Sequence, residues 1–272
     1  MPRRRPSFSL TLAAALTLGG GLAATLVLTA SVGRLEFDNK ALAFEQATGM
    51  RVAALRRGMD DAVEVLNVTN QLFATVQPVT RAQFHDFTAP LLHRHPYIRA
   101  FNFHRYVAAA GRAAIEAELQ HVRPGTVLHE MRGETAVPVP ERSSYKVVDY
   151  LEPMAGNEPA LGLDVARNLE VARALERALA SGRAAATGLL RLAQDSAGKA
   201  SFEVVMPVYG AGGAVGDTAA VIDLQTLART ALSSAALIED RGILLRVYLG
   251  GEARPASLVY ANFDGAPVGQ PA

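Results

Sequence analysis

The sequence of 272 residues contains no cysteine and no tryptophan, and lysine occurs at only three positions, Lys40, Lys146 and Lys199. The absence of cysteine excludes disulfides, thiolate zinc sites, iron–sulfur clusters and a cysteine nucleophile. Without tryptophan, an aromatic cage around a ligand must be built from tyrosine or phenylalanine. Apolar residues, by contrast, make up 50% of the chain, which is enough for a substantial hydrophobic core.

Net charge and motifs exclude several classes of function. The 27 basic and 26 acidic residues give a net charge of +1, so nucleic acid is not an expected partner. The sequence lacks the GxSxG, HExxH, GxxxxGK[ST] and kinase signatures, and we expect no catalytic activity and no cofactor. His93, His95 and His104 could bind a metal, but a helix end before Pro96 explains the first two better, and we expect no metal site.

The first 32 residues predict a membrane anchor. Residues 8–32 carry no charged side chain, and 25 residues of helix span about 37 Å, enough for the hydrocarbon core of a bilayer. Because Arg3, Arg4 and Arg5 precede this segment, we expect residues 1–7 in the cytoplasm and everything after residue 33 outside the inner membrane, in the periplasm. A cleaved signal peptide is the alternative, but its apolar region is normally only about 7–15 residues long.

Residues 33–77 predict a long stalk helix that leaves the membrane. Its apolar positions alternate in steps of four and three, the heptad spacing of paired helices. Those that we expect at a dimer seam are Val52, Leu55, Met59, Leu66 and Phe73. The same spacing fits a helix that packs along its own domain, so a homodimer and an intramolecular role both stay open.

The rest of the chain predicts an α+β module of short strands with helices between them. Thr80 to Gln83 is a capping-box pattern that begins a helix, and Asp223 is placed to cap another at Leu224–Leu232. Residues 122–143, rich in proline and glycine, predict an irregular loop. The expected strands are 98–107, 144–151, 187–192, 202–209, 219–222, 243–249 and 258–262, and a further helix is expected at 168–180.

Polar residues around the strand 144–151 and beyond it are candidate ligand anchors. A small-molecule site needs a mostly apolar cavity with a few fixed polar groups, and hydroxyl, amide and carboxylate groups suit that purpose. The candidates are Tyr145, Tyr150, Glu152, Asn157, Asp164, Thr187 and Gln194. For two of them a structural role is the alternative, since Asn157 can hold a turn and Asp164 can cap a helical segment.

The same region resembles a known family. The strand Tyr145–Pro153, Asn157, the run Ala160–Asp164, the helix Ala172–Ala180 and the strand Val205–Tyr209 occur in the order and spacing of the CHASE domain. This is the extracytoplasmic sensor of many bacterial receptors and of plant cytokinin receptors. Residues 101–107 resemble its preceding strand, and the match covers about residues 95–235.

The resemblance implies two PAS-like subdomains on a long helix. The first, residues 78–210, would be membrane-distal and bind a small ligand; the second, residues 211–265, would be membrane-proximal, followed by a tail at 266–272. It also implies a second membrane span and a cytoplasmic histidine kinase, as in two-component systems, or a diguanylate cyclase. Since nothing after Ala236 is long and apolar enough to span, we expect this chain to be the sensor portion of such a receptor.

The sequence therefore predicts a membrane-anchored receptor that senses a small molecule and relays the signal across the membrane. Cytokinin is not the expected ligand, because Pro153 lies near the position where cytokinin receptors have an acidic residue that reads adenine. Two alternatives stay open. One is an anchored periplasmic hydrolase using Asp164, Glu152 or Glu203 with a histidine, and the other is a ligand-free dimerisation adaptor.

Overall fold

The computed structural model describes residues 8–133, 135–190, 201–238, 243–250 and 253–263. The candidate anchor Gln194 and the predicted terminal segments 1–7 and 266–272 lie outside the described residues. The chain divides into two units, residues 1–52 and residues 53–272, and each is described by itself.

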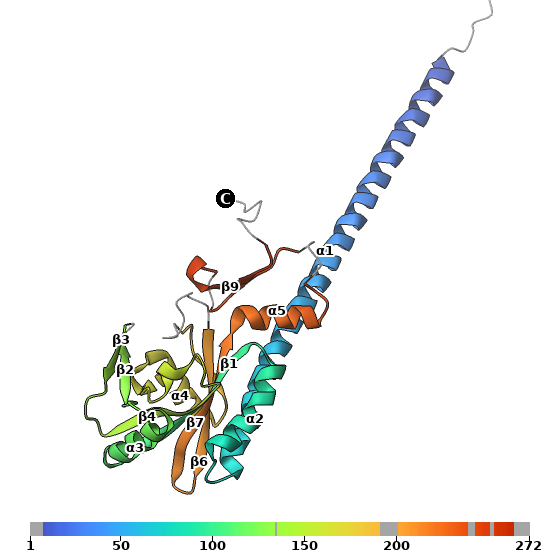
Figure 1. The fold of residues 1–272 in the computed structure, drawn as a ribbon. Helices are drawn as coiled ribbons and strands as arrows, with labels where there is room; N and C mark the ends of the chain where they lie inside the picture. Colours follow the sequence, from blue (N-terminus) through green and yellow to red (C-terminus); the bar gives the residue numbers. More distant parts are fainter. Residues whose placement is uncertain (1–7, 134, 191–200, 239–242, 251–252, 264–272) are drawn as a thin grey trace, which may run out of the picture. The chain divides into compact units, whose positions relative to one another are not determined.

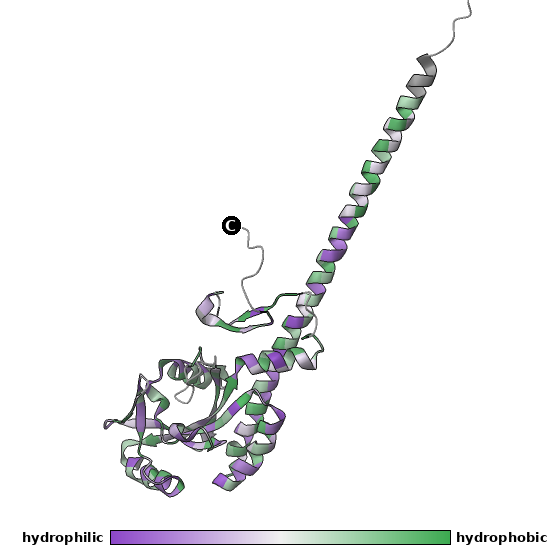
Figure 2. Cartoon of the chain, turned by 45° about the horizontal axis from the view of Figure 1, so that its top comes forward, coloured by the Kyte–Doolittle hydropathy of each residue, from purple (hydrophilic) through white to green (hydrophobic). Residues whose placement is uncertain are grey.

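The first unit consists of the N-terminal part of α1, a helix that runs from Phe8 to Thr75. Among the described residues, α1 is the one helix long and apolar enough to cross a membrane. Figure 2 shows its N-terminal part almost without hydrophilic residues, which begin further along the helix. The leucines at 16, 18, 22 and 26 are all more than 60% exposed, as expected of a helix whose apolar surface is covered by something other than this chain.

The second unit is built on a five-stranded antiparallel sheet in the order β4-β1-β7-β6-β5 (Figure 1). The three central strands are long: β1 (Ile98–Ala108), β7 (Gly213–Asp223) and β6 (Ser201–Gly210). The edges are β4 (Ser144–Glu152) and the two-residue β5 (Ala185–Ala186). The fold is the mixed α+β class that the sequence predicts.

Strands β6 and β7 form one hairpin that pairs from Ser201↔Asp223 to Gly210↔Gly213, with one shift of register between Val208 and Tyr209. The expected boundary between subdomains, at residues 210/211, lies in the turn of this hairpin. Strand β7 therefore belongs to the larger sheet, and the expected second subdomain is left with α5 and the strands that follow it. The division into two subdomains itself stays a prediction.

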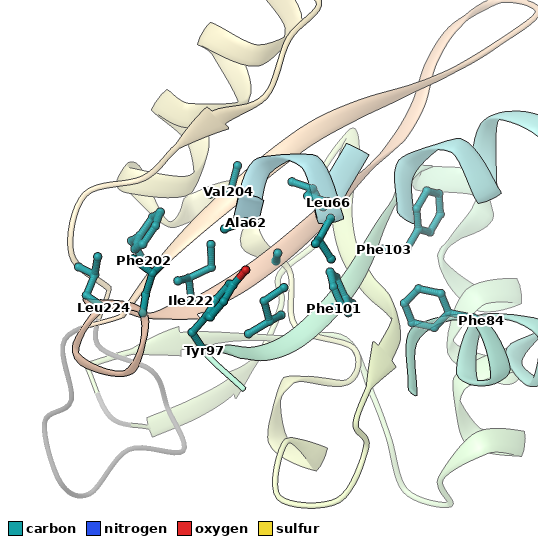
Figure 3. Close-up of a cluster of buried hydrophobic side chains, with 14 of the residues drawn as sticks. Ala62, Leu66, Phe84, Tyr97, Phe101, Phe103, Phe202, Val204, Ile222 and Leu224 are labelled. Atoms are coloured by element: carbon teal, nitrogen blue, oxygen red, sulfur yellow. The ribbon is translucent and has the colours of Figure 1, made fainter. Parts of the chain in front are cut away.

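One face of the sheet packs against the C-terminal part of α1 and against α2 (Arg81–Arg94). Alternate residues of the strands, such as Phe101, Val204 and Ile222, meet Ala62 and Leu66 of α1 there (Figure 3). The ring of Phe73 stacks on Phe103 with centroids 4.2 Å apart. This packing stabilises residues 53–75 of α1 as a helix, because the apolar face of this part is buried in its own domain.

The residues predicted at a dimer seam differ in burial. Leu66 and Phe73 are buried in this core and have no surface left for a partner helix, whereas Met59 is only partly buried against it and its place at a dimer seam stays a prediction. Leu55 packs against Ala228 and Leu232. Val52 is 55% exposed, and its role at a dimer seam stays a prediction.

The opposite face of the sheet is covered in part by α4 (Leu169–Ser181), which buries Val171, Leu175 and two alanines against it. Two local signals fix the ends of this helix. The Asn168 side chain accepts hydrogen bonds from the backbone N–H groups of Glu170 and Val171, and Gly182 takes the left-handed conformation with φ of 65°.

The segment 122–143, predicted as an irregular loop, contains a second small sheet, and that part of the prediction is wrong. After α3 (Arg112–Val122), strands β2 (His129–Arg132) and β3 (Thr135–Pro138) pair antiparallel. Gly133, with φ of 63°, supplies the left-handed turn residue that a tight hairpin needs.

After β7 the chain enters α5 (Leu224–Ser234), where Asp223 caps the backbone N–H of Thr226 as predicted. Strands β8 (Arg246–Tyr248) and β9 (Leu258–Ala261) then pair with each other. Helix α5 lies close against α1: a Cβ atom on Gly58 would be 3.0 Å from the Cβ of Ala231.

Candidate functional site

Two of the predicted ligand anchors, Tyr145 and Asp164, meet through Arg142. The Tyr145 hydroxyl accepts the backbone N–H of Arg142 at 2.8 Å, and the Arg142 guanidinium donates to Asp164 at 2.7 Å and to Glu130. Asp164 also accepts the backbone N–H of Lys146 and caps a short helical turn through Ala166. This network holds β2, β4 and the turn together, so each of the two anchors has an intramolecular partner.

Tyr150 and Glu152 lie elsewhere, on the side of β4 that faces α2. The Tyr150 hydroxyl donates to the Val79 carbonyl at 2.7 Å, and its ring lies edge-on to Phe73 and Phe84. Glu152 pairs with His85 of α2 at 3.0 Å. These contacts connect α2 to the sheet.

Asn157 and Thr187 also have local partners. The Asn157 amide donates to the Pro153 carbonyl, which is the turn-holding role that the sequence left open. Thr187 accepts the backbone N–H of Glu203 through its hydroxyl at 2.9 Å. The structure therefore does not gather the predicted anchors into one site, and ligand contact by any of them stays a prediction.

The structure does gather five other polar side chains on the sheet face opposite the α1 core. Asn102, His104 and Tyr106 alternate along β1 on this face, with Asp217 beside them on β7 and Glu203 on β6. We call these five residues the polar cluster. Four of its members are 0–6% exposed, which is unusual for polar residues and demands hydrogen-bond partners.

Within the polar cluster, His104 is the central residue. Its Nδ1 lies 2.8 Å from the Asp217 carboxylate, and its Nε2 lies 3.7 Å from Glu203. The Asn102 amide donates to Glu203 at 3.3 Å, although β1 and β6 are separated by β7. That contact is possible because Ala219, the β7 residue opposite Asn102, carries only a methyl group.

Burial and charge shift the pKa values of the polar cluster. Burial alone would lower the pKa of His104, but the negative charges of Asp217 and Glu203 outweigh it and the pKa is raised. Burial raises the pKa of Glu203 more than the positive charge of His104 lowers it. Burial and then the charge of Asp217 raise the pKa of Tyr106. Strongly perturbed groups that lie together are typical of functional sites.

Sequence reasoning missed the polar cluster, although a signal for it was present. In the expected strand 98–107 alternate residues point to opposite faces, so Phe101 and Phe103 share one face, and Asn102, His104 and Tyr106 share the other. Glu203 and Asp217 are acidic residues in otherwise apolar strands. Their burial is the informative feature, and it depends on strands far apart in the sequence.

The histidines considered for a metal site do not converge. His93 lies in the last turn of α2, the His95 ring contacts the Tyr97 hydroxyl, and His104 is in the polar cluster. Among the described residues, no group of three His, Asp or Glu side chains is arranged to hold a metal ion. Of the carboxylates considered for a hydrolase, only Glu203 lies in the polar cluster.

A family model for the CHASE domain matches residues 77–260. Among curated proteins no match was found. Similar solved structures include the ligand-binding domain of the amino acid chemoreceptor PctC from Pseudomonas aeruginosa PAO1, in complex with GABA (15% identity, TM-score 0.39). An extracellular ligand-binding receptor from Desulfohalobium retbaense (12%, 0.41) and a methyl-accepting chemotaxis protein X (13%, 0.45) are also similar.

These three alignments cover 67%, 70% and 81% of this chain and 60%, 27% and 77% of the respective structures. This chain therefore spans less than two thirds of the first two.

Proposed function

This chain belongs to the CHASE domain family, and from that premise we propose that it is the ligand-sensing portion of a membrane receptor. The ligand is a small molecule, and the residues that bind it are those of the polar cluster. The cytoplasmic output, a histidine kinase or a diguanylate cyclase, lies outside this sequence.

The observation that carries the proposal is the polar cluster itself. Burying His104, Glu203 and Asp217 in the middle of a sheet costs free energy, which a purely structural domain avoids by placing apolar side chains there. The rest of the same face is apolar, with Ala100, Val205 and Val221 packed under α4. An apolar surface with a few buried, fixed polar groups is the usual composition of a small-molecule site.

Helix α1 provides the path for the signal in this proposal. The helix contributes Leu66 and Phe73 to the core of the sensing domain, and the apolar segment of residues 8–32 belongs to the same helix. A ligand that favours one of two packings of the sheet on α1 would thereby change the state of the membrane anchor. We place the sensing domain in the periplasm, with lipid around residues 8–32 and Val52 at the seam of a homodimer.

The experiment is thermal melting of the full chain in detergent micelles against a metabolite library. We expect at least one small molecule to raise Tm, and the increase to be lost in His104→Gln. His121→Gln is the matched control, because His121 lies exposed on α3 outside the polar cluster and should keep the response. A library with no stabilising ligand, together with a dimer that forms regardless of added metabolites, would favour the adaptor alternative instead.

A further inference from the structure

The polar cluster itself supplies two hydrogen-bond donors for Asp217. His104 Nδ1 lies 2.8 Å from one oxygen of the Asp217 carboxylate. The other oxygen and the Tyr106 hydroxyl are both buried without a hydrogen-bond partner, and burial and the nearby charge of Asp217 raise the pKa of Tyr106. An ionised carboxylate accepts from both an imidazole N–H and a hydroxyl. The contact with Asp217 therefore places a proton on His104 Nδ1.

The other ring nitrogen of His104 faces Glu203. The distance from His104 Nε2 to the Glu203 carboxylate is 3.7 Å, and both side chains are buried. If His104 were neutral and Glu203 ionised, Nε2 would present a lone pair to a negatively charged oxygen away from bulk water. One proton removes this repulsion, either on Nε2 as an imidazolium or on Glu203 as a neutral acid. The geometry therefore requires one proton that His104 and Glu203 hold between them.

The charges around His104 agree with this count. The charged and titratable groups beside it are Tyr106 on its own strand, Asp217 on β7, Glu203 on β6 and Lys146 on β4, whose Nζ lies 5.0 Å from the centre of the Tyr106 ring. Helix α4 packs only apolar side chains among its buried residues. With the shared proton in place, the polar cluster carries one net negative charge, which Lys146 balances. Without it, two ionised carboxylates are buried together.

Burial and charge make both groups hold protons to a higher pH than usual. Burial lowers the pKa of His104, but Asp217 and Glu203 raise it by more, and burial raises the pKa of Glu203. In the unfolded chain the two groups titrate near 6.5 and 4.5. The folded chain therefore binds more protons than the unfolded chain above these values. The resulting stability is lost as pH rises through the raised pKa values.

We infer that His104 and Glu203 form a proton-binding site inside the sensing domain, and that the domain responds to the pH of its surroundings by releasing this proton as the pH rises. Release leaves buried, ionised carboxylates on β6 and β7 and breaks the favourable contact between β1 and β6. The inference goes beyond the proposed function, because it concerns the chain without a small-molecule ligand and names the proton as a second signal.

The first test is an NMR titration of the six histidine rings of the full, ligand-free chain in detergent micelles. Replacing each of the other five histidines by glutamine in turn assigns their signals and leaves that of His104. We expect the last titration step at the His104 ring to have its midpoint above pH 6.5. This midpoint should fall in Glu203→Gln, where a neutral amide of the same shape replaces the carboxyl group. Glu176→Gln, on the exposed side of α4, is the matched control and should leave the midpoint unchanged.

The second test measures the effect of the proton on stability. Urea unfolding is followed from about pH 5 to about pH 9, and release of one proton lowers the folding equilibrium constant by up to about tenfold per pH unit. We expect this decrease to be smaller in Glu203→Gln. Both proteins carry His85→Gln, because the His85–Glu152 pair would add a pH dependence of its own.

The outcomes separate this inference from the proposed function. A His104 midpoint at or below pH 6.5 in the wild-type chain would overturn the inference without the need for any folded variant. An equal pH dependence of stability with Glu203 and with glutamine at this position would overturn it as well. Neither result bears on the binding of a small molecule, which the metabolite library tests. A chain that binds no metabolite but titrates as described would support the inference alone.

Discussion

Asp149 shows how single residues hold the sensing domain together. It is fully buried, and its two oxygens pair with Arg81 of α2 at 2.6 Å and with Arg105 of β1 at 2.5 Å. Arg81 also lies over the ring of Tyr150 and donates to the Asp149 carbonyl. One carboxylate therefore ties a helix and two strands together.

Asp149→Asn should destabilise the protein by roughly 2 kcal/mol, because it removes the charge from a hydrogen bond to Arg81 and from an ion pair with Arg105, two arginines that are about one third exposed and partly solvated. The free energy of unfolding of the full chain, from a urea titration followed by tyrosine fluorescence, measures this. Glu118→Gln is the control: it removes the exposed partner of Arg105 and should cost less than about 0.5 kcal/mol. Equal losses in the two variants would contradict the role given to Asp149.

The His85–Glu152 pair gives a pH-dependent contact between α2 and β4. The hydrogen bond to Glu152, and then its charge, raise the pKa of His85. A raised pKa means that the pair stabilises the fold below the ordinary histidine pKa of about 6.5, and that this contribution is lost as pH rises through the raised value. An NMR titration of His85 should give a midpoint above that of a free histidine, and Glu152→Gln should return it to the ordinary value. A midpoint that Glu152→Gln leaves in place would show that the pair does not form in solution.

At the scale of elements, strands β1 and β7 approach each other closely beside the polar cluster. Gly216 of β7 is packed so tightly against β1 that a Cβ atom there would be 2.5 Å from the His104 carbonyl oxygen and 2.5 Å from the Phe103 ring. Glycine is needed at this position for space, and the close approach fixes Asp217, the next residue, against His104.

Gly216→Ala should therefore destabilise the domain by about 1–3 kcal/mol through overpacking and should weaken ligand binding as β7 moves away from β1. Gly212→Ala, in the turn of the same hairpin, is the matched control, since its Cβ would meet nothing within 4 Å. Urea unfolding and ligand-dependent melting of both variants measure the difference. A Gly216→Ala protein as stable as Gly212→Ala would show that the two strands are further apart than described.

Elements with strong local signals were predictable from the sequence. The capping box from Thr80 to Gln83, the Asp223 cap and the strand at 98–107 are all present where they were expected. Each depends on contacts within a few residues, or on a periodicity that one element contains by itself. The hairpin of β2 and β3 was missed because proline and glycine in 122–143 indicate turns and do not reveal four-residue strands between them.

Local sequence patterns do not show which part of the protein covers a given face of a helix or strand. The heptad spacing correctly marked Leu66 and Phe73 as one apolar face, but the face is covered by the chain's own sheet. Asn102 and His104 were placed on a strand, yet alternation alone cannot distinguish a polar face in water from one buried beside Glu203 and Asp217. The first question is decided by the packing of α1 on the sheet, and the second by strands whose contacting residues are more than 100 residues apart in sequence.

For the whole molecule, the membrane topology is the property on which sensing depends. The apolar segment of α1 and the arginines before it predict that residues after 33 face the periplasm. Because the chain has no cysteine, single cysteines introduced on either side of the segment can report this without background.

In spheroplasts, a membrane-impermeant maleimide should label Ala155→Cys, an exposed position of the sensing domain, and should label Ser7→Cys only after permeabilisation. The labelled fraction of each variant, before and after permeabilisation, is the measurement. The reverse pattern would place the sensing domain in the cytoplasm and remove the basis of the receptor proposal.

The absence of a side chain at Gly58 allows α5 to pack directly on the backbone of α1. Strand β7 carries Asp217 and continues through Asp223 directly into α5. Ala231 of α5 packs so closely on Gly58 that a Cβ atom at position 58 would lie 3.0 Å from the Ala231 Cβ. Protein interiors are close-packed and compress little. A side chain larger than hydrogen at position 58 would therefore push α5 away from α1, and with it the end of β7 that leads into α5.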